Sequence, residues 1–219
     1  MEIGASIGHY TSSAGTIGFF ARRNTDGALG LVSNNHVIAA QDCGQENDEI
    51  LHPAPADRGS SPNDIVAYLA GDYPRLQDQT VDCAFARLAH GTDCDAMTLS
   101  TKERLRNTIA IAEKYLQVEK IGRTTGRTAG RITAIDLDFF DVQYSFGYVP
   151  FFDQIEIEAV SESPFYRTGD SGALVFTRDC EPLALLFLGT RAGGAFNCGR
   201  GYAHPIANVL RSLDITFAS

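Results

Sequence analysis

The chain has 219 residues, of which 44% are hydrophobic, so it is long enough to bury a large core within one domain. Its formal net charge of −9 argues against a protein that follows a phosphate backbone or an anionic membrane surface, so we expect neither a nucleic-acid nor a membrane partner. No stretch offers the roughly 20 apolar residues of a membrane span and no export signal is recognisable, so we expect a cytoplasmic protein.

Short runs rich in β-branched and aromatic residues recur between turn signals, which predicts an all-β protein. These runs are GTIGFFARR, GALGLVSN, DIVAYLAG, DCAFARL, LQVEKIG, AGRITAIDLDFFDVQYS, FDQIEIEAV, GALVF and LALLFLG. The turn sequence NTDG at residues 24–27 separates the first two runs and predicts a hairpin. Residues 100–116 and 205–213 have a helical pattern instead.

The first helical segment divides the strand-rich sequence into two parts. We therefore predict one domain over residues 1–219, built from an N-terminal barrel at about residues 10–95 and a C-terminal barrel at about residues 117–203. A helical linker joins the barrels in this prediction, and a C-terminal helix at residues 204–214 closes the domain.

The most informative motif is GDSG at residues 169–172, which an apolar strand follows. A serine between small residues suits a nucleophile on a tight turn. The backbone N–H groups of Gly169 and Ser171 would then point at one spot and stabilise an oxyanion. An ordinary glycine turn before a strand is the alternative interpretation.

Acyl transfer by a serine also needs a base and a carboxylate that holds the base in the right tautomer. His36 follows an apolar strand in LVSNNHVIA, and Asp82 interrupts the apolar run VDCAFARL. A buried carboxylate is costly unless it is hydrogen-bonded, and the N–H of a histidine would satisfy Asp82. We therefore predict His36 as the base, Asp82 as its orienting partner and Ser171 as the nucleophile.

In this order, the motifs NNHV, DCAFA and GDSGA resemble the catalytic blocks of chymotrypsin-type (trypsin-like) serine peptidases, and NNHV is most like the HtrA branch. Longer blocks resemble the Narrow Leaf-like peptidases of plants and bacteria, namely NDEILHPAPADRGSSPNDIVAYLAGDYPRL, EKIGRTTGRTAGRI and GYAHPIANVLRSLDI. The resemblance implies two antiparallel six-stranded β-barrels with the active site between them. It also implies a serine endopeptidase that works through an acyl-enzyme and pairs residues 185–189 with an extended substrate.

The resemblance also indicates which residues form the substrate pocket. Phe165 lies six residues before the serine, and an apolar side chain at the pocket floor favours a small or medium apolar substrate residue, with Glu162 as an alternative lining residue. We predict substrate contacts from Phe165, Leu188, Gly189 and His204.

The motifs depart from those of secreted zymogens. Val37 follows His36 where a bridging cysteine would stand, and no activation sequence precedes the first strand. Asp170 therefore cannot be assumed to pair with a freshly cut N-terminus, and the group that it does pair with is left open.

An arginine-rich segment and the cysteines are the other residue clusters of the sequence. Arg123, Arg127 and Arg131 recur in GRTTGRTAGR without the lysine of a G-x4-G-K-S/T phosphate loop, so we interpret the glycines as turn residues, with an anionic regulator as the alternative. The five cysteines form no metal-ligand pairs, so we expect reduced thiols, no metal and no cofactor, with a bridge between Cys180 and Cys198 left open.

The partner that we expect is a protein or peptide substrate, including the case of one specific partner protein. Two alternatives to the endopeptidase remain open. One is a catalytically silent, peptide-binding two-barrel scaffold, and the other is a small-ester hydrolase. The oligomeric state is left open.

Overall fold

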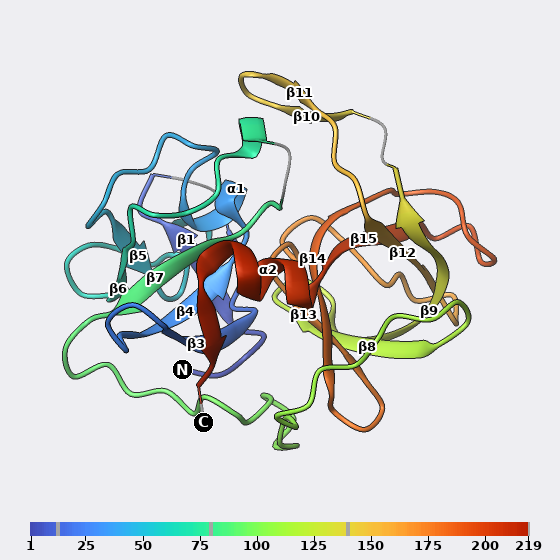
Figure 1. Cartoon of the computed structure of the whole chain (residues 1–219), viewed down its shortest axis with the longest axis horizontal. Coiled ribbons are helices and arrows are strands. Elements are labelled where there is room, and N and C mark those ends of the chain that lie inside the picture. Colours follow the sequence, from blue (N-terminus) through green and yellow to red (C-terminus); the bar gives the residue numbers. More distant parts are fainter. Residues whose placement is uncertain (12–13, 79–80, 139–140, 219) are drawn as a thin grey trace.

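The computed structural model of the chain describes residues 1–11, 14–78, 81–138 and 141–218. Two units built mainly of strands lie side by side along the longest axis of the molecule, with the last helix between them (Figure 1). The N-terminal unit contains β1 (Ser6–His9), β2 (Gly15–Thr16), β3 (Phe19–Arg23), β4 (Leu29–Ser33), α1 (Asn35–Ile38), β5 (Glu49–Leu51), η1 (Pro55–Asp57), β6 (Ile65–Leu69), η2 (Leu76–Asp78) and β7 (Ala84–Leu88).

The second unit is a closed barrel of six antiparallel strands, in the order β12-β15-β14-β13-β8-β9. These strands are β8 (Gln117–Gly122), β9 (Gly126–Leu137), β12 (Gln154–Ala159), β13 (Leu174–Thr177), β14 (Pro182–Gly189) and β15 (Arg200–Pro205). A two-stranded hairpin, β10 (Val142–Tyr144) and β11 (Gly147–Val149), interrupts the path from β9 to β12. The all-β, two-barrel fold predicted from the sequence is confirmed.

The N-terminal unit differs from the expected closed six-stranded barrel. In the described residues it is one eight-stranded sheet, which the last strand of the chain, β16 (Ile215–Phe217), joins. The strand order is β16-β3-β4-β7-β6-β5-β1-β2, and the sheet curls without closing. One reason lies in β2, which is two residues long and faces the other unit, where the Thr16 backbone N–H donates to the Ser171 carbonyl (2.8 Å). The predicted hairpin at residues 24–27 is confirmed, since β3 and β4 pair on either side of it.

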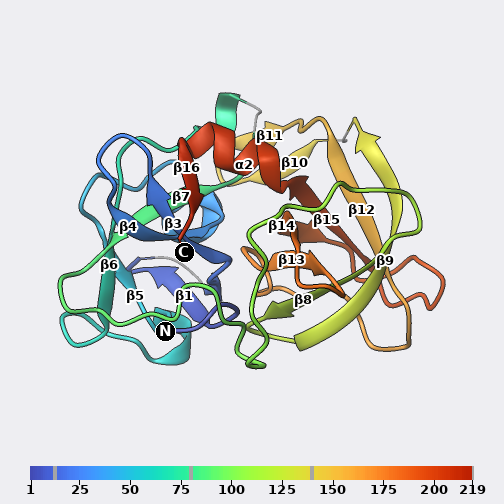
Figure 2. The ribbon, with the colours of Figure 1, turned by 60° about the horizontal axis from the view of Figure 1, so that its bottom comes forward.

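The helical linker predicted at residues 100–116 is wrong, because the structure has no helix there. The backbone groups of this segment bond to distant parts of the chain: the Arg106 N–H donates to the Cys180 carbonyl (2.9 Å), and the Ala110 N–H to the Pro182 carbonyl (2.8 Å). Ile109, one of the apolar residues of this segment, is 42% exposed. The segment instead runs over the outside of the molecule from one unit to the other (Figure 2).

The predicted C-terminal helix is confirmed as α2 (Ile206–Leu213). Its buried residues Ile206, Val209 and Leu213 belong to a hydrophobic cluster that contains most of the N-terminal core and extends to strands of the second barrel. Beyond the helix, β16 pairs with β3. The chain end therefore ties the second unit to the first. No helix in the described part of the chain has the length and apolar character to cross a bilayer.

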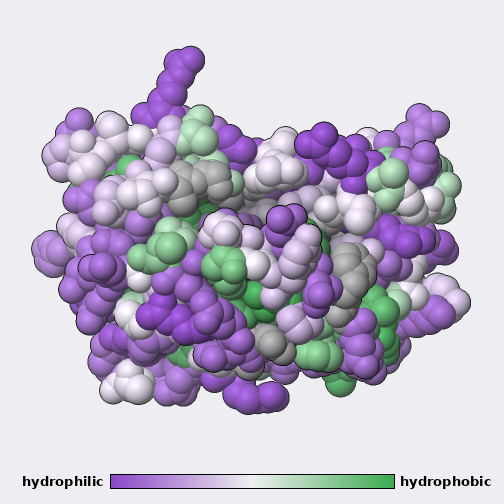
Figure 3. Space-filling model, turned by 90° about the horizontal axis from the view of Figure 1, so that it is seen from above, coloured by the Kyte–Doolittle hydropathy of each residue, from purple (hydrophilic) through white to green (hydrophobic). Residues whose placement is uncertain are grey.

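The β10–β11 hairpin extends from the second barrel toward the first unit, at the top of Figure 1. The face of the molecule on this side is mostly hydrophilic, with hydrophobic residues in small separate groups (Figure 3). Phe146 and Tyr148 of the hairpin are 41% and 65% exposed, so the hairpin contributes aromatic surface as well as backbone.

Candidate active site

His36 and Asp82 are brought together by neighbouring strands of the first sheet. His36 lies in the single turn of α1 that follows β4, and Asp82 lies two residues before β7. Because β4 pairs with β7 so that Ser33 faces Ala84, the residues just beyond this point emerge side by side. Pairing in the sheet thus brings together two residues that are far apart in the sequence.

The His36 imidazole and the Asp82 carboxylate are hydrogen-bonded, with 2.5 Å between Nδ1 and Oδ2. The His36 backbone N–H also donates to Oδ1 of Asp82 (3.1 Å). Asp82 is fully buried, and burial acts to raise the pKa of its carboxyl. The charge and hydrogen bond of His36 outweigh this effect and hold the pKa of Asp82 below its ordinary value. The carboxylate therefore stays ionised and fixes the ring of His36.

Tyr144, a residue of the second unit, is a further hydrogen-bond donor to the Asp82 carboxylate. The Tyr144 hydroxyl donates to Oδ2 of Asp82 (2.8 Å), and burial followed by the charge of Asp82 raises the pKa of Tyr144, so the phenol keeps its proton. The next residue in the hairpin, Ser145, donates its backbone N–H to the Gln41 side chain (2.7 Å). The sequence did not predict Tyr144, since its only signal was an aromatic residue at the end of an apolar run.

His204 lies next to Asp82, although we predicted it as a substrate-binding residue. Its Nε2 accepts the Asp82 backbone N–H (3.0 Å), and its ring stacks on Phe187 with 4.1 Å between ring centroids. Burial lowers the pKa of His204 to about 4, so the ring is neutral and its proton is on Nδ1. This atom has no partner among the described residues, and the side chain is 0% exposed, so it offers no surface to a substrate here.

Ser171 lies on the tight turn that the GDSG motif predicts. Gly169 and Gly172 have φ values of +100° and +91°, which favour glycine, and a Cβ on Gly172 would lie 2.2 Å from the Ser33 hydroxyl. The Ser171 hydroxyl donates to the Phe187 carbonyl (3.1 Å). Within the described residues, no hydrogen bond joins this hydroxyl to the His36 imidazole.

Four of the eight predicted site residues line one cavity of about 200 Å³. His36, Gly169, Ser171 and Leu188 line it, together with residues of the β10–β11 hairpin. Gly189 borders a neighbouring cavity of about 380 Å³. Phe165 lines neither, because it is fully buried in the core of the second barrel.

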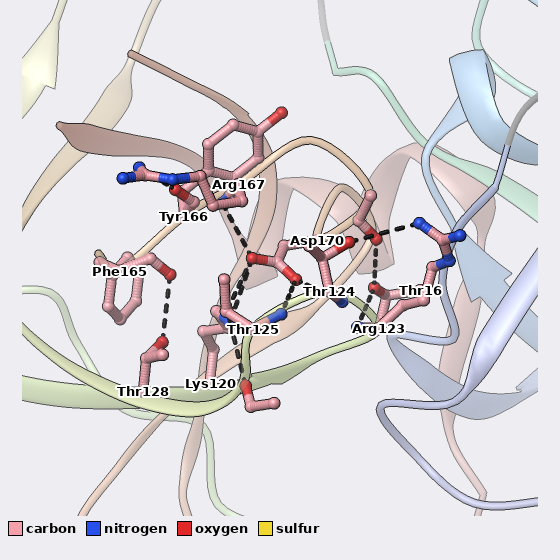
Figure 4. A network of polar contacts seen from close by, with 12 residues as sticks. Thr16, Lys120, Arg123, Thr124, Thr125, Thr128, Phe165, Tyr166, Arg167 and Asp170 are labelled. Carbon is pink, nitrogen blue, oxygen red and sulfur yellow. Dashed lines mark hydrogen bonds and ion pairs between the residues drawn. The ribbon is translucent and has the colours of Figure 1, made fainter. Parts of the chain in front are cut away.

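Asp170, whose partner the sequence does not identify, forms a buried ion pair with Lys120. Its carboxylate accepts the backbone N–H groups of Thr124, Thr125 and Arg167 at 2.9–3.0 Å and the Thr125 hydroxyl at 2.7 Å (Figure 4). Lys120 of β8 places its Nζ 3.3 Å from Oδ2 of Asp170, and both side chains are 0% exposed. Burial lowers the pKa of Lys120, and the charge of Asp170 opposes this effect. The ion pair therefore anchors the turn before Ser171 from inside the barrel.

A hydrogen bond fixes the orientation of the peptide group between Thr168 and Gly169. The Thr168 carbonyl accepts the Thr124 hydroxyl (2.9 Å). Because a trans peptide points its N–H opposite to its C=O, the Gly169 N–H points away from Thr124.

The arginines of the GRTTGRTAGR segment and the cysteines do not line the cavity that contains Ser171. Each of the three arginines of the GRTTGRTAGR segment forms an ion pair with a carboxylate, the pairs being Arg123–Asp57, Arg127–Glu103 and Arg131–Glu158. The cysteines are free thiols in the described structure, and Cys180 and Cys198 pack against different hydrophobic cores. No group of three or more metal-ligating side chains was found among the described residues.

Comparisons with known proteins fit this architecture. No family model matches the chain. It is 28% identical over 213 residues to Protein NARROW LEAF 1 of Oryza sativa subsp. japonica, a match that covers 85% of this chain and 35% of the rice protein. The chain thus spans about a third of the length of that relative.

Solved structures resemble the whole chain. Thermobifida fusca Protease A has a TM-score of 0.67 and 20% identity, and the match covers 100% of this chain and 98% of that one. A glutamic acid-specific serine protease that uses a histidine triad in substrate binding has a TM-score of 0.70 and 20% identity, with both chains covered completely. Together with the closed barrel and the curled sheet beside it, these matches show that the chain has the two-barrel fold of the chymotrypsin-like serine proteases.

Proposed function

We propose that this protein is a serine endopeptidase in which His36 is the general base, Asp82 its orienting partner and Ser171 the nucleophile. The observation that carries the proposal is the His36–Asp82 hydrogen bond at the edge of a cavity that Ser171 also lines. The residues come from both units, and the fold is that of known serine proteases.

The reaction begins when the Ser171 hydroxyl turns from the Phe187 carbonyl to Nε2 of His36 and attacks the substrate carbonyl carbon. Catalytic hydrogen bonds of this kind often form only with substrate bound. His36 takes the hydroxyl proton as the Oγ–C bond forms, then gives it to the leaving amine as the C–N bond breaks. A water molecule repeats the sequence on the acyl-enzyme and restores the Ser171 hydroxyl.

The negative charge on the substrate oxygen needs donors that are already in place. The backbone N–H groups of Gly169 and Ser171 fill this role. The bond from Thr124 to the Thr168 carbonyl turns the Gly169 N–H away from Thr124, which supports the assignment. The Lys120–Asp170 pair stabilises the same turn and takes the place of a newly cut N-terminal amine.

An extended substrate would continue the sheet of the second barrel. β13 pairs with β14 as far as Leu185, and beyond that point Leu188 lines the cavity. Main-chain hydrogen bonds to residues 188–189 would hold the substrate in β-strand geometry.

Cleavage of a peptide library by the wild type and by Ser171→Ala tests the proposal. We expect the wild type to hydrolyse peptide bonds and the variant to lose about 10⁴- to 10⁶-fold in kcat, with its melting temperature unchanged. Ser163→Ala, which changes an exposed serine of the preceding segment, is the matched control and should keep full activity. Equal hydrolysis by wild type and Ser171→Ala would exclude this mechanism, and hydrolysis of esters alone would favour the small-ester hydrolase.

A further inference from the structure

Tyr166 lies between the nucleophile and the end of β14. Its ring packs against Gly189 so closely that a Cβ on that glycine would lie 2.2 Å from the ring carbon Cδ1 and 2.6 Å from Cγ. At the other end of the ring, the hydroxyl lies 3.3 Å from the Ser171 hydroxyl. The side chain therefore spans the distance from the β14 backbone to the nucleophile.

The same side chain lines two cavities. Tyr166 lines the cavity of about 200 Å³ that contains Ser171, and it also lines the cavity of about 380 Å³ bordered by Gly189, Thr190 and Arg191. The first cavity is smaller than the roughly 300–1,000 Å³ of typical ligand pockets. The ring of Tyr166 thus acts as a partition that keeps the space beside the nucleophile shallow.

The substrate residue whose carbonyl is attacked must place its side chain in this space. Its carbonyl carbon has to come within about 3–3.5 Å of the Ser171 hydroxyl, so its Cα is next to the nucleophile. The adjoining walls are Thr168, Phe187, Leu188 and the ring of Tyr166. A large side chain could enter only by displacing the ring from its contact with Gly189.

On the basis of the proposed function, we propose that Tyr166 is a specificity-determining residue. Its ring fills the pocket for the side chain of the substrate residue before the cleaved bond. The enzyme therefore cleaves after glycine or alanine. Aromatic and long aliphatic residues are excluded at this position by steric conflict with the ring. Burial raises the pKa of Tyr166, which therefore keeps its hydroxyl proton and adds no charge to the pocket.

The test uses peptides that share one cleaved sequence and differ only in the residue before the cleaved bond: glycine, alanine, leucine or phenylalanine. We expect the wild type to favour glycine and alanine over phenylalanine by at least about 100-fold in kcat/KM. In Tyr166→Ala the two cavities join, and cleavage after phenylalanine should rise at least about tenfold. Tyr166→Phe keeps the ring and should retain the preference for small residues.

Tyr115→Ala is the matched control, because Tyr115 is 63% exposed on the segment between the units, and its cleavage profile should equal that of the wild type. Wild-type cleavage after phenylalanine as efficient as after alanine would overturn the inference alone, and this measurement needs no variant to fold. An unchanged profile in a folded Tyr166→Ala would overturn it as well. Absence of hydrolysis by every folded protein would overturn the proposed function, and the inference with it.

Discussion

Asp82 carries its negative charge inside the protein, where an isolated carboxylate would cost several kcal/mol. Three donors reach its two oxygens: the Nδ1–H and the backbone N–H of His36, and the hydroxyl of Tyr144. Hydrogen bonds to a charged group contribute about 1.5–3 kcal/mol each and offset that cost. Because Nδ1 of His36 donates to Asp82, Nε2 is the nitrogen left to accept a proton.

The sequence motifs predict the three catalytic residues but not the buried lysine behind the turn of Ser171. His36, Asp82 and Ser171 each lie in a recognisable motif, and the structure places the first two in contact and the third at the same cavity. Lys120 was not predicted, because a lysine in a strand normally faces solvent. Its burial depends on a carboxylate that lies 50 residues later in the sequence and that only the fold brings near.

Lys120→Met tests the anchor of the turn before Ser171. Removing one member of a buried ion pair leaves the other charge without a partner, so we expect a loss of about 3–5 kcal/mol in the free energy of unfolding and a lower kcat. Lys102→Met is the control, because Lys102 is 73% exposed and pairs with Glu2 at the surface. Its free energy of unfolding should be indistinguishable from that of the wild type. Chemical denaturation that gave equal losses for the two variants would show that the buried pair has no special role.

At the scale of secondary structure, the β10–β11 hairpin is the element that the sequence described least well. The run AGRITAIDLDFFDVQYS is continuous in composition, but β9 ends at Leu137 and β10 begins at Val142. An apolar run alone does not show where a strand turns away from its sheet. The linker at residues 100–116 failed for a related reason, since a helical pattern says nothing about backbone partners in distant strands.

The hairpin carries a prediction of its own. Tyr144→Phe keeps the ring beside Phe151 and removes the donor to Asp82. The lost hydrogen bond should raise the pKa of Asp82 and lower kcat about 10- to 100-fold, with KM nearly unchanged, because the hydroxyl orients the catalytic groups. Steady-state kinetics beside Tyr148→Phe, an exposed tyrosine of the same hairpin, provides the comparison. A rise in KM without a change in kcat would mean that the hydroxyl serves substrate binding instead.

Over the whole molecule, the candidate site depends on contacts between the two units. The His204 ring supports Asp82 from the second barrel, Thr16 of the first unit bonds to the Ser171 carbonyl, and β16 returns to pair with β3. None of these contacts is local in sequence, so no motif could predict them. The two-barrel arrangement itself was predictable because strand-rich blocks and turn signals are local features.

His204 makes the stability of the whole molecule depend on pH. Its pKa is about 4 in the folded chain and 6.5 as an ordinary histidine, so between these values the unfolded chain binds the extra proton. The free energy of unfolding should therefore fall as the pH drops from about 6.5 toward 4, by an amount on the order of 2–3 kcal/mol.

His204→Gln keeps an acceptor for the Asp82 N–H but has no group that titrates in this range. Denaturation at pH 7 and pH 4.5 should show a smaller loss of stability on acidification in His204→Gln than in the wild type. His90→Gln, at an exposed site, should behave like the wild type. The same loss in all three proteins would mean that His204 is not the group responsible.

Covalent labelling with a fluorophosphonate tests the central claim most directly, because the reagent bonds to a serine hydroxyl that a neighbouring base has activated. We predict a single adduct, which peptide mass spectrometry locates on Ser171 of the folded wild type, with labelling abolished in Ser171→Ala and slowed by at least about 10³-fold in His36→Ala. A folded wild-type protein that takes up no label on Ser171, or takes it up equally well without His36, would contradict the account.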